Sequence, residues 1–357
     1  MADDELLGGV GRAAGQALET NSNAGEAPVP GPRDGRRRRA IPETAALFLV
    51  LIALCVFFSV TSQFFLRPDN LINILQNVAR IGIIAGPATL LLIGGQFDLS
   101  VGSVAAFSAM VMAVLAGDPA VNTSGFAFGL PLEVAFLGAM VASILVGVMN
   151  AVSVTVFRIN ALITTLATLA IFRGLTKVLG NGQTIVVDNF DPLGTTRILG
   201  LPLPVYFFFG ISFLTLLVLR FTTYGRSMYA TGASPTAARL AGIRTDRAIF
   251  IGFVVTAAAA GFSGLILLSQ VAGASINANI GLELAVVTAV ILGGASLSGG
   301  RGGIVGTTLA VLIVGVLGNG LIQLGVPTYW IEVANGVLLL AAVGFDQLRI
   351  RLTRATA

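Results

Sequence analysis

Residues 94–103 read GGQFDLSVGS and separate two long apolar runs. Two adjacent glycines let the backbone turn where other residues could not. Asp98 and Ser100 stand just before the next apolar run, where such side chains cap helix N-termini. The stretch therefore predicts a helix cap at a tight turn. The alternative is a broken helix lining a pathway, because irregular backbone survives inside a membrane only within protein or beside water.

The composition indicates that these residues belong to a membrane protein. Of 357 residues, 55% are hydrophobic and 11% are charged, whereas a soluble domain is about 25% charged. Residues 45–66 alone exceed the roughly 18 apolar residues that cross a bilayer. The chain has no histidine, which excludes imidazole catalysis and histidine-ligated metals. A single cysteine, Cys55, excludes an intrachain disulfide and a cysteine-rich metal site.

The apolar runs predict an all-α polytopic membrane protein of ten transmembrane helices. The eighth run is too short to cross a bilayer alone unless protein shields it. The expected spans lie near residues 45–65, 71–93, 101–117, 131–157, 161–179, 204–221, 247–270, 284–297, 303–322 and 328–346.

The basic residues predict how these spans are oriented. With the N-terminus in the cytoplasm, only Arg67 and Arg197 fall in outer loops, and most other arginines fall in inner loops or tails. This is the positive-inside pattern. An even number of spans then places both termini in the cytoplasm. The formal charge of +4 is explained by this topology, and no nucleic-acid partner is needed.

Two polar tails flank the expected membrane domain, residues 44–348. Residues 1–43 lack a periodic apolar face and are predicted to be a disordered cytoplasmic tail. The arginine run at residues 36–39 is interpreted as a topology anchor that touches anionic lipid. Residues 349–357 are the expected cytoplasmic C-terminal tail.

The longest internal cytoplasmic loop, residues 222–246, carries the signals of a short helix. Ser234 suits the N-cap, Pro235 the first helical position and Gly242 the position just past the end. So short a helix is marginal alone in water, so we expect it to dock on a partner. The residues between the two ends are Thr236, Ala237, Ala238, Arg239, Leu240 and Ala241.

A weak internal echo accompanies these features. Residues 293–302 read GGASLSGGRG, which again sets two glycines before Leu-Ser and another glycine. Transporters commonly carry internal duplications. The echo therefore suggests a repeat within the chain.

Polar residues inside or beside the spans are mostly uncharged. A neutral polar lining suits a neutral hydroxylated solute better than a proton, which needs chains of buried carboxylates. Arg80, Arg173 and Lys177 are expected to be structural, either paired or snorkelled to the interface. The predicted pathway residues are Gln96, Asp98, Asn150, Asn160, Thr164 and Thr165.

The sequence disfavours two other classes of function. An ion-coupled secondary transporter would need carboxylates near mid-span, and those of Asp98, Glu283 and Glu332 fall near predicted span ends. A membrane-embedded enzyme would need a nucleophile with a base nearby, which the sequence does not offer. The chain also lacks a G-x-x-x-x-G-K-[ST] phosphate loop, so ATP-driven transport would need a partner that binds ATP.

Four ordered motifs resemble the permease subunits of the ribose/xylose/galactose class of ATP-binding-cassette (ABC) importers. The similarity runs from about residue 45 to the C-terminus, and the arginine-rich tail is not part of it. The motifs are IGGQFDLSVGSVAAFSAMV at 93–111, NALITTLATLAIFRGLTKVLGNGQTI at 160–185, TTYGRSMYATGASPTAARLAGI at 222–243 and ILGGASLSGGRGGIVGT at 291–307.

The resemblance implies an ABC importer permease fold in the inner membrane of a bacterium. It implies a homodimer or related heterodimer of such subunits, two cytoplasmic ATPases that bind ATP and Mg²⁺, and an external sugar-binding protein. It assigns residues 234–242 as the helix that couples to the ATPase. The implied solute is a monosaccharide, and a non-sugar solute stays open because branched-chain amino-acid permeases are distant relatives.

Overall fold

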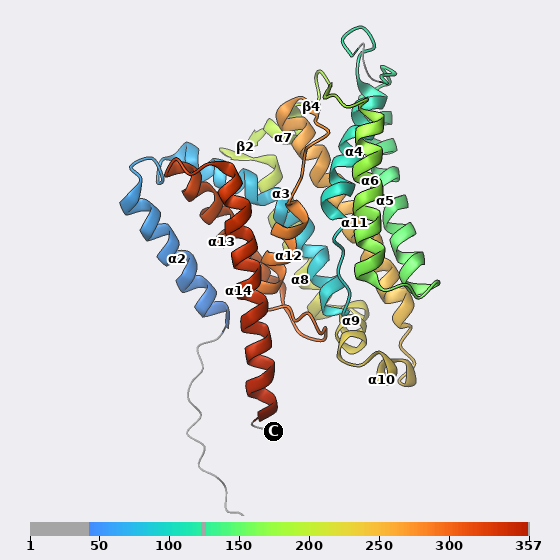
Figure 1. Ribbon diagram of the computed structural model, residues 1–357, viewed down its shortest axis with the longest axis vertical. Helices are drawn as coiled ribbons and strands as arrows, with labels where there is room; N and C mark the ends of the chain where they lie inside the picture. Colours follow the sequence, from blue (N-terminus) through green and yellow to red (C-terminus); the bar gives the residue numbers. More distant parts are fainter. Residues whose placement is uncertain (1–42, 123–125, 356–357) are drawn as a thin grey trace, which may run out of the picture. The chain divides into compact units, whose positions relative to one another are not determined.

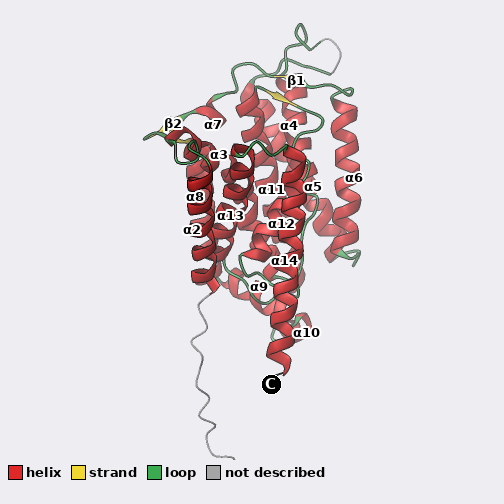
Figure 2. Cartoon of the chain, turned by 60° about the vertical axis from the view of Figure 1, so that its left-hand side comes forward, coloured by secondary structure: helices red, strands yellow, loops and turns green. Residues whose placement is uncertain are grey.

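Helices make up most of the chain in the computed structural model, which describes residues 43–122 and 126–355 (Figures 1 and 2). The predicted N-terminal tail with its arginine run therefore lies outside the described residues, apart from Glu43, where the first described helix begins. The longer helices are α2 (Glu43–Thr61), α3 (Pro68–Ile93), α4 (Val101–Ala116), α5 (Leu132–Thr155), α6 (Ala161–Leu179), α8 (Leu203–Phe221), α11 (Thr245–Val271), α12 (Leu282–Leu292), α13 (Ile304–Gln323) and α14 (Thr328–Ala355).

Each of the ten predicted spans coincides with one of these helices. Within the described residues, seven helices are long and apolar enough to cross a membrane. The shorter apolar segments are α4, α12 and the Tyr329–Gly344 part of α14. The eighth predicted span is the 11-residue α12, most of whose residues are buried in the protein, as its short run requires. At its C-terminal end, α14 continues as a helix to Ala355, through most of the predicted tail.

The remaining elements are small and lie in the connections. The helices are α7 (Pro192–Thr195), α9 (Thr223–Ala233) and α10 (Pro235–Leu240). Two antiparallel pairs join β1 (Ile185–Val186) to β4 (Gly273–Ala274), and β2 (Arg197–Ile198) to β3 (Leu201–Pro202). Figure 1 shows β2 and β4 at the end of the bundle opposite α9 and α10.

Both α4 and α12 begin partway between the two ends of the bundle. Figure 1 shows residues 94–100 rising from the lower end to α4, and the segment after β4 descending to α12. The two N-termini meet, because a Cβ on Gly102 of α4 would overlap a carboxylate oxygen of Glu283 in α12. The sequence placed Asp98 and Glu283 near span ends. They do lie at the starts of the corresponding helices, but those starts are partway along the bundle rather than at its ends.

A unit of long helix, irregular segment and short helix occurs twice in the fold. It comprises α3 with α4, and α11 with α12, and the two units run in opposite directions in Figure 1. Inverted units of this kind are typical of transporters. The sequence echo marks different segments, because residues 94–100 join α3 to α4 whereas residues 293–303 join α12 to α13. Those two segments lie side by side, with the Gly300 amide donating to the Ile93 carbonyl at 2.8 Å.

The long helix α11 forms the centre of the bundle and packs on α3, α4 and α5. Small residues permit this close approach, as is usual between membrane helices. A Cβ on Gly264 would overlap the backbone of Ala105, and one on Gly147 would crowd the backbone of Val254. Large apolar side chains remain exposed on the outer faces of α5, α6 and α8, including Leu137, Ile163 and Phe213. Such faces suit contact with lipid.

Substitution of Gly264 by alanine is expected to destabilise the bundle, because the new methyl group meets main-chain atoms of Ala105 that cannot rotate away. Overpacking of this kind typically costs about 1–3 kcal/mol. Gly210→Ala in α8 is the matched control, since nothing lies within 4 Å of its Cβ position. The melting temperature of the purified protein in detergent should fall for Gly264→Ala and not for Gly210→Ala. Equal values would contradict the proposed contact.

Candidate functional site

The segment over residues 222–246 forms two helices at the lower end of the bundle in Figure 1. The Thr222 hydroxyl accepts the Gly225 amide at the start of α9. The Ser234 hydroxyl accepts the Ala237 amide at 3.3 Å, so Ser234 is the N-cap of the six-residue α10. Gly242 has a φ of +82°, the left-handed conformation that suits a residue just past a helix end. The helix expected from the sequence is therefore present.

Helix α9 is an addition to the sequence expectation, which treated residues 222–233 as loop. The residues of α9 are on average only weakly apolar, and contacts with the rest of the bundle stabilise the helix. Met228 is buried, and the hydroxyls of Tyr224 and Tyr229 donate to the carbonyls of Ala248 and Gly302. Burial raises the pKa of both tyrosines. Tertiary contacts of this kind leave no periodic signal in the sequence.

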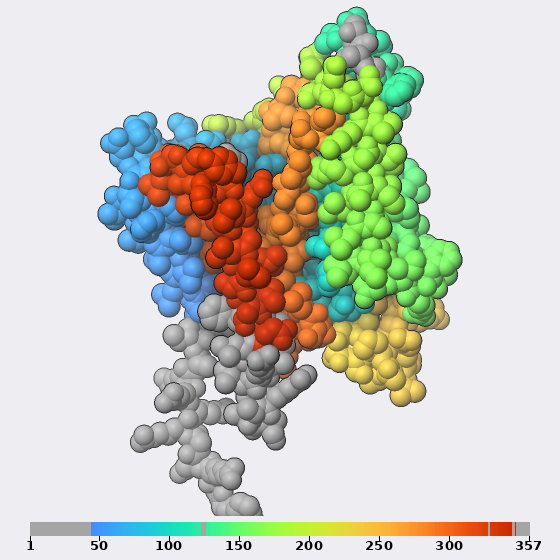
Figure 3. All heavy atoms as spheres, viewed as in Figure 1, coloured from blue at the N-terminus to red at the C-terminus, as the bar shows by residue number. Residues whose placement is uncertain are grey.

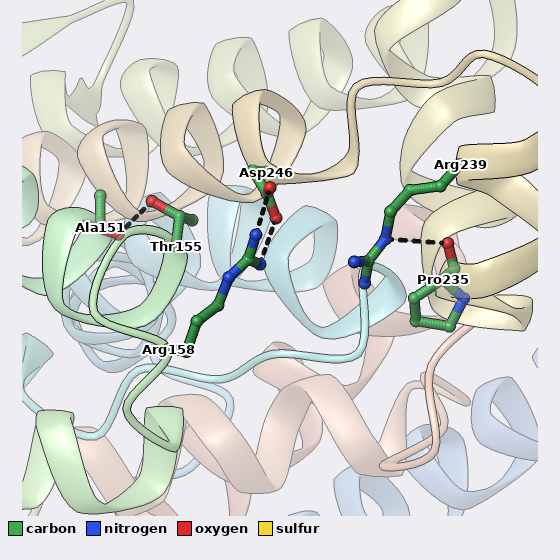
Figure 4. Close-up of polar contacts among 6 residues, drawn as sticks. All are labelled: Ala151, Thr155, Arg158, Pro235, Arg239 and Asp246. Atoms are coloured by element: carbon green, nitrogen blue, oxygen red, sulfur yellow. Dashed lines mark hydrogen bonds and ion pairs between the residues drawn. The ribbon is translucent and has the colours of Figure 1, made fainter.

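The outward face of α10 is made of Arg239 and Leu240. Leu240 is 86% exposed, whereas Ala238 is only 3% exposed and packs inward. The Arg239 Nε donates to the Pro235 carbonyl at 3.3 Å, which holds the guanidinium along the helix (Figure 4). Figure 3 shows this yellow segment at the lower edge of the view. Ala238 is thus used within the chain, whereas Ala237 is exposed and the free surface of α10 includes the basic Arg239 and the apolar Leu240.

An ion pair lies next to α10 and joins two connections of the bundle. Arg158, between α5 and α6, donates to both carboxylate oxygens of Asp246 in the first turn of α11, at 2.7 and 2.8 Å (Figure 4). These hydrogen bonds and the charge of Asp246 raise the pKa of Arg158. Both side chains are exposed, so the pair contributes orientation more than stability.

A glycine contact links α9 to the interior. A Cβ on Gly232 would overlap the carbonyl of Ile93, the last residue of α3. Gly95 has a φ of +79°, and the amide of Gln96 donates back to the Leu91 carbonyl, which ends α3 as the two glycines predicted. We call Gly95, Gly232, Gly299 and Gly300, which pack together here, the glycine seam.

Asp98 accepts an amide just before α4, as expected of a carboxylate there, and it also belongs to a buried polar network. Ser100 makes no side-chain cap of α4, so the expectation is wrong for that residue. One Asp98 oxygen accepts both the amide and the hydroxyl of Ser100, at 2.8 and 2.5 Å. Asn150 of α5 donates to the Ser100 hydroxyl at 3.0 Å and accepts from Thr168 of α6 at 2.6 Å. The network ties the irregular segment to two neighbouring helices.

The other predicted pathway residues lie in different surroundings. Asn160 is exposed and caps α6 by accepting the Leu162 amide, and Gln96 is half-buried. Thr165 is buried and donates to the Ala161 carbonyl of its own helix. Thr164 is also buried, and its hydroxyl has no hydrogen-bond partner among the described residues. Their role along a pathway stays a prediction.

The fold is a bundle of apolar helices. Two helix–break–helix units, α3–α4 and α11–α12, lie inside it, and the short exposed α10 lies between the long helices α8 and α11. These features together are typical of a membrane permease. Residues 70–343 match the family described as "Branched-chain amino acid transport system / permease component", and the chain belongs to this family. As a permease component it is not the enzyme of its transport system, whose ATPase is a separate subunit.

Several curated relatives are similar over most of their length. The L-arabinose ABC transporter permease protein of Azospirillum brasilense is 34% identical, covering 87% of this chain and 89% of the relative. The ribose import permease protein of Bacillus subtilis is 35% identical, covering 84% of this chain and 91% of the relative. The D-allose transport system permease protein of Escherichia coli is 33% identical, covering 84% of this chain and 90% of the relative. No solved structure matches the chain.

Loss of the α10 cap is expected to loosen that helix alone. Ser234→Ala removes the acceptor for the Ala237 amide, at a cost of about 1 kcal/mol. Hydrogen exchange at the amides of Ala237 and Ala238 should become faster. Ser227→Ala in α9 is the control, because its hydroxyl donates only to the Thr223 carbonyl of the same helix. Unchanged exchange in Ser234→Ala would contradict the cap.

Disruption of the Asp98 network is expected to destabilise the packing around α4. Asn150→Leu removes the bonds to Ser100 and Thr168. Each hydroxyl keeps one other partner, so the loss is about 0.5–1.5 kcal/mol for each bond. The melting temperature in detergent should fall well below that of Ser153→Ala, whose hydroxyl bonds only within α5. Equal melting temperatures would show that the network is not stabilising.

Proposed function

We propose that this chain is the membrane-spanning subunit of an ATP-driven, binding-protein-dependent importer of a monosaccharide. The similarity to ribose, arabinose and allose permeases, over more than four-fifths of the chain, carries the proposal. A non-sugar solute is the second candidate, since the matched family is described by branched-chain amino acids. Sugar is favoured because the relatives are sugar permeases and because most pathway candidates are uncharged.

The proposed topology has ten spans in a bacterial inner membrane, with both termini in the cytoplasm. It is supported by Figure 1, in which α2 begins and α14 ends at the end that also carries α9 and α10. The arginines of the loops at that end, among them Arg158, Arg239 and Arg244, agree with the positive-inside pattern. The lower end of Figure 1 is then cytoplasmic, and the end with β2 and β4 receives the solute.

In the proposed mechanism, α10 transmits the work of the ATPase to the bundle. A cytoplasmic ATPase with ATP and Mg²⁺ docks on Arg239 and Leu240, and residues 234–242 move with it. Closure of two ATPases rocks two permease subunits, as a homodimer, between inward-open and outward-open states. An external binding protein delivers the solute, and lipid surrounds the apolar outer faces.

Transport by the complete system tests this function. The chain is reconstituted in vesicles with its ATPase and binding protein, and uptake of labelled pentoses, hexoses and leucine is measured. We expect ATP-dependent uptake of a sugar. Uptake of leucine alone would favour the second candidate, and uptake driven by an ion gradient without ATP would contradict an ABC importer.

Charge changes on the outward face of α10 are expected to weaken ATPase docking. Leu240→Asp and Arg239→Glu place negative charge on the exposed surface without disturbing buried groups. Retention of the ATPase on the affinity-purified permease should fall by roughly tenfold. The matched controls are Leu199→Asp and Arg197→Glu, both exposed at the opposite end of the bundle. Equal retention in all four variants would exclude α10 as the docking helix.

A further inference from the structure

A cavity of about 550 Å³ lies between α3, α12 and α14. Its volume is in the range of small-molecule sites, about 300–1,000 Å³. Its wall is mixed, with apolar residues such as Ile81, Leu267 and Ile331 beside a group of polar ones. The polar lining consists of Asn77, Arg80, Asn279, Glu283, Glu332 and Asn335. None of these residues was expected from the sequence to contact a solute.

The cavity adjoins the place where the two short helices meet. The Glu283 carboxylate contacts the start of α4 and accepts the Gly281 amide at 3.3 Å at the start of α12. Helix N-termini carry partial positive charge, so both stabilise this carboxylate. Arg173 of α6 donates to the carbonyls of Ala278 and Asn279, at 2.6 and 3.3 Å. It therefore holds the irregular segment before α12 instead of extending to the membrane surface.

Three polar atoms at the cavity have no hydrogen-bond partner among the described residues. They are the Arg80 Nε, the Asn279 Nδ2 and one Glu283 carboxylate oxygen, each buried. The backbone of Arg80 is fixed, because its carbonyl accepts the Ser263 hydroxyl of α11 at 3.0 Å. Leaving such groups unpaired costs about 1–3 kcal/mol each, and more when they are charged. The residues that line the cavity thus carry two donors and an acceptor without partners, and a side-chain rotation that turns them toward a hydrogen-bonding occupant would pair them.

The lining is matched to an uncharged occupant with many hydroxyl groups. The positive charges of Arg80 and of the adjacent Arg173 are balanced by Glu283 and Glu332, so the surroundings carry no net charge for an ion to neutralise. A hydroxyl both donates and accepts, as the three asparagines also do. Asn77 and Glu332 are exposed in this chain. Polar groups so placed in a membrane face water or protein rather than lipid.

We propose that this cavity holds the solute during its passage, with Glu283 accepting from the hydroxyls of a neutral polyol and Arg80 and the asparagines donating to it. This assignment rests on the proposed function and names the solute-contacting residues of that function. Arg80 and Glu283 thereby take a role in binding, whereas the Asp98 network keeps a role in holding the break before α4.

The first experiment separates solute contact from a structural role of Glu283. Glu283→Gln retains the shape and an acceptor oxygen for Gly281 but removes the charge. Sugar uptake by the complete reconstituted transporter should fall by roughly tenfold or more, while the variant is still recovered folded in detergent and still binds its ATPase. Glu133→Gln is the matched control, an exposed carboxylate in the first turn of α5. Uptake at the wild-type rate in Glu283→Gln would overturn the proposal, as would loss of folding together with uptake.

The second experiment tests whether a sugar occupies the cavity. Cys55→Ala removes the only cysteine, and Asn335→Cys or Leu199→Cys then introduces a single thiol. A high concentration of the free transported sugar should slow methanethiosulfonate labelling at position 335 several-fold and leave position 199 unchanged. Leu199 is 95% exposed and lies outside the cavity lining. Equal labelling at position 335 with and without sugar, or protection by leucine instead of sugar, would overturn the assignment.

The two proposals fail in distinguishable ways. If the wild-type transporter takes up no sugar, the proposed function fails, and the cavity assignment fails with it. If the wild-type transporter takes up sugar but neither variant differs from its control, only the cavity assignment fails.

Discussion

Every backbone amide and carbonyl inside a bilayer needs a partner within the protein, and this requirement governs the fold around its two helix breaks. Residues 94–100 and the segment before α12 are irregular backbone inside the bundle, made largely of turns. Asp98 accepts from Ser100 in the first break, and Arg173 donates to two carbonyls in the second. Each break is thus held by one charged side chain supported by neighbouring helices. The short helices α4 and α12 exist because these breaks are satisfied.

Much of the fold follows from periodicity and length in the sequence. The ten apolar runs coincide with ten helices, and the shortness of the eighth run corresponds to α12. Depth does not follow, because a hydropathy pattern does not say where along the membrane normal a helix begins. Asp98 and Glu283 were therefore assigned to span ends. In the sequence analysis, carboxylates at span ends were an argument against an ion-coupled transporter. With both carboxylates partway along the bundle that argument no longer holds, and the match to a permease family now favours the importer instead.

The candidate sites divide in a similar way. Helix α10 was predictable because Ser234, Pro235 and Gly242 are local signals, whereas α9 and the orientation of Ala238 depend on contacts with distant segments. The cavity was not predictable, since Arg80, Glu283 and Asn335 come from three helices far apart in sequence. Arg80 and Arg173 were expected to have structural roles, because arginines within membrane spans usually pair with other protein groups or extend to the membrane surface. Only their different partners separate the two: Arg173 binds carbonyls, and the Nε of Arg80 binds nothing in the described chain.

The glycine seam has a mechanical consequence for the path between α9 and the first break. Side chains at an ordinary interface absorb a small displacement by changing rotamer. Glycine has no side chain, so Gly232 against Ile93 and Gly299 against Gly95 bring main chain directly onto main chain. A displacement of α9 is therefore passed to the end of α3 with less relaxation than side chains would allow, and Gly95, with its positive φ, lies directly at that end.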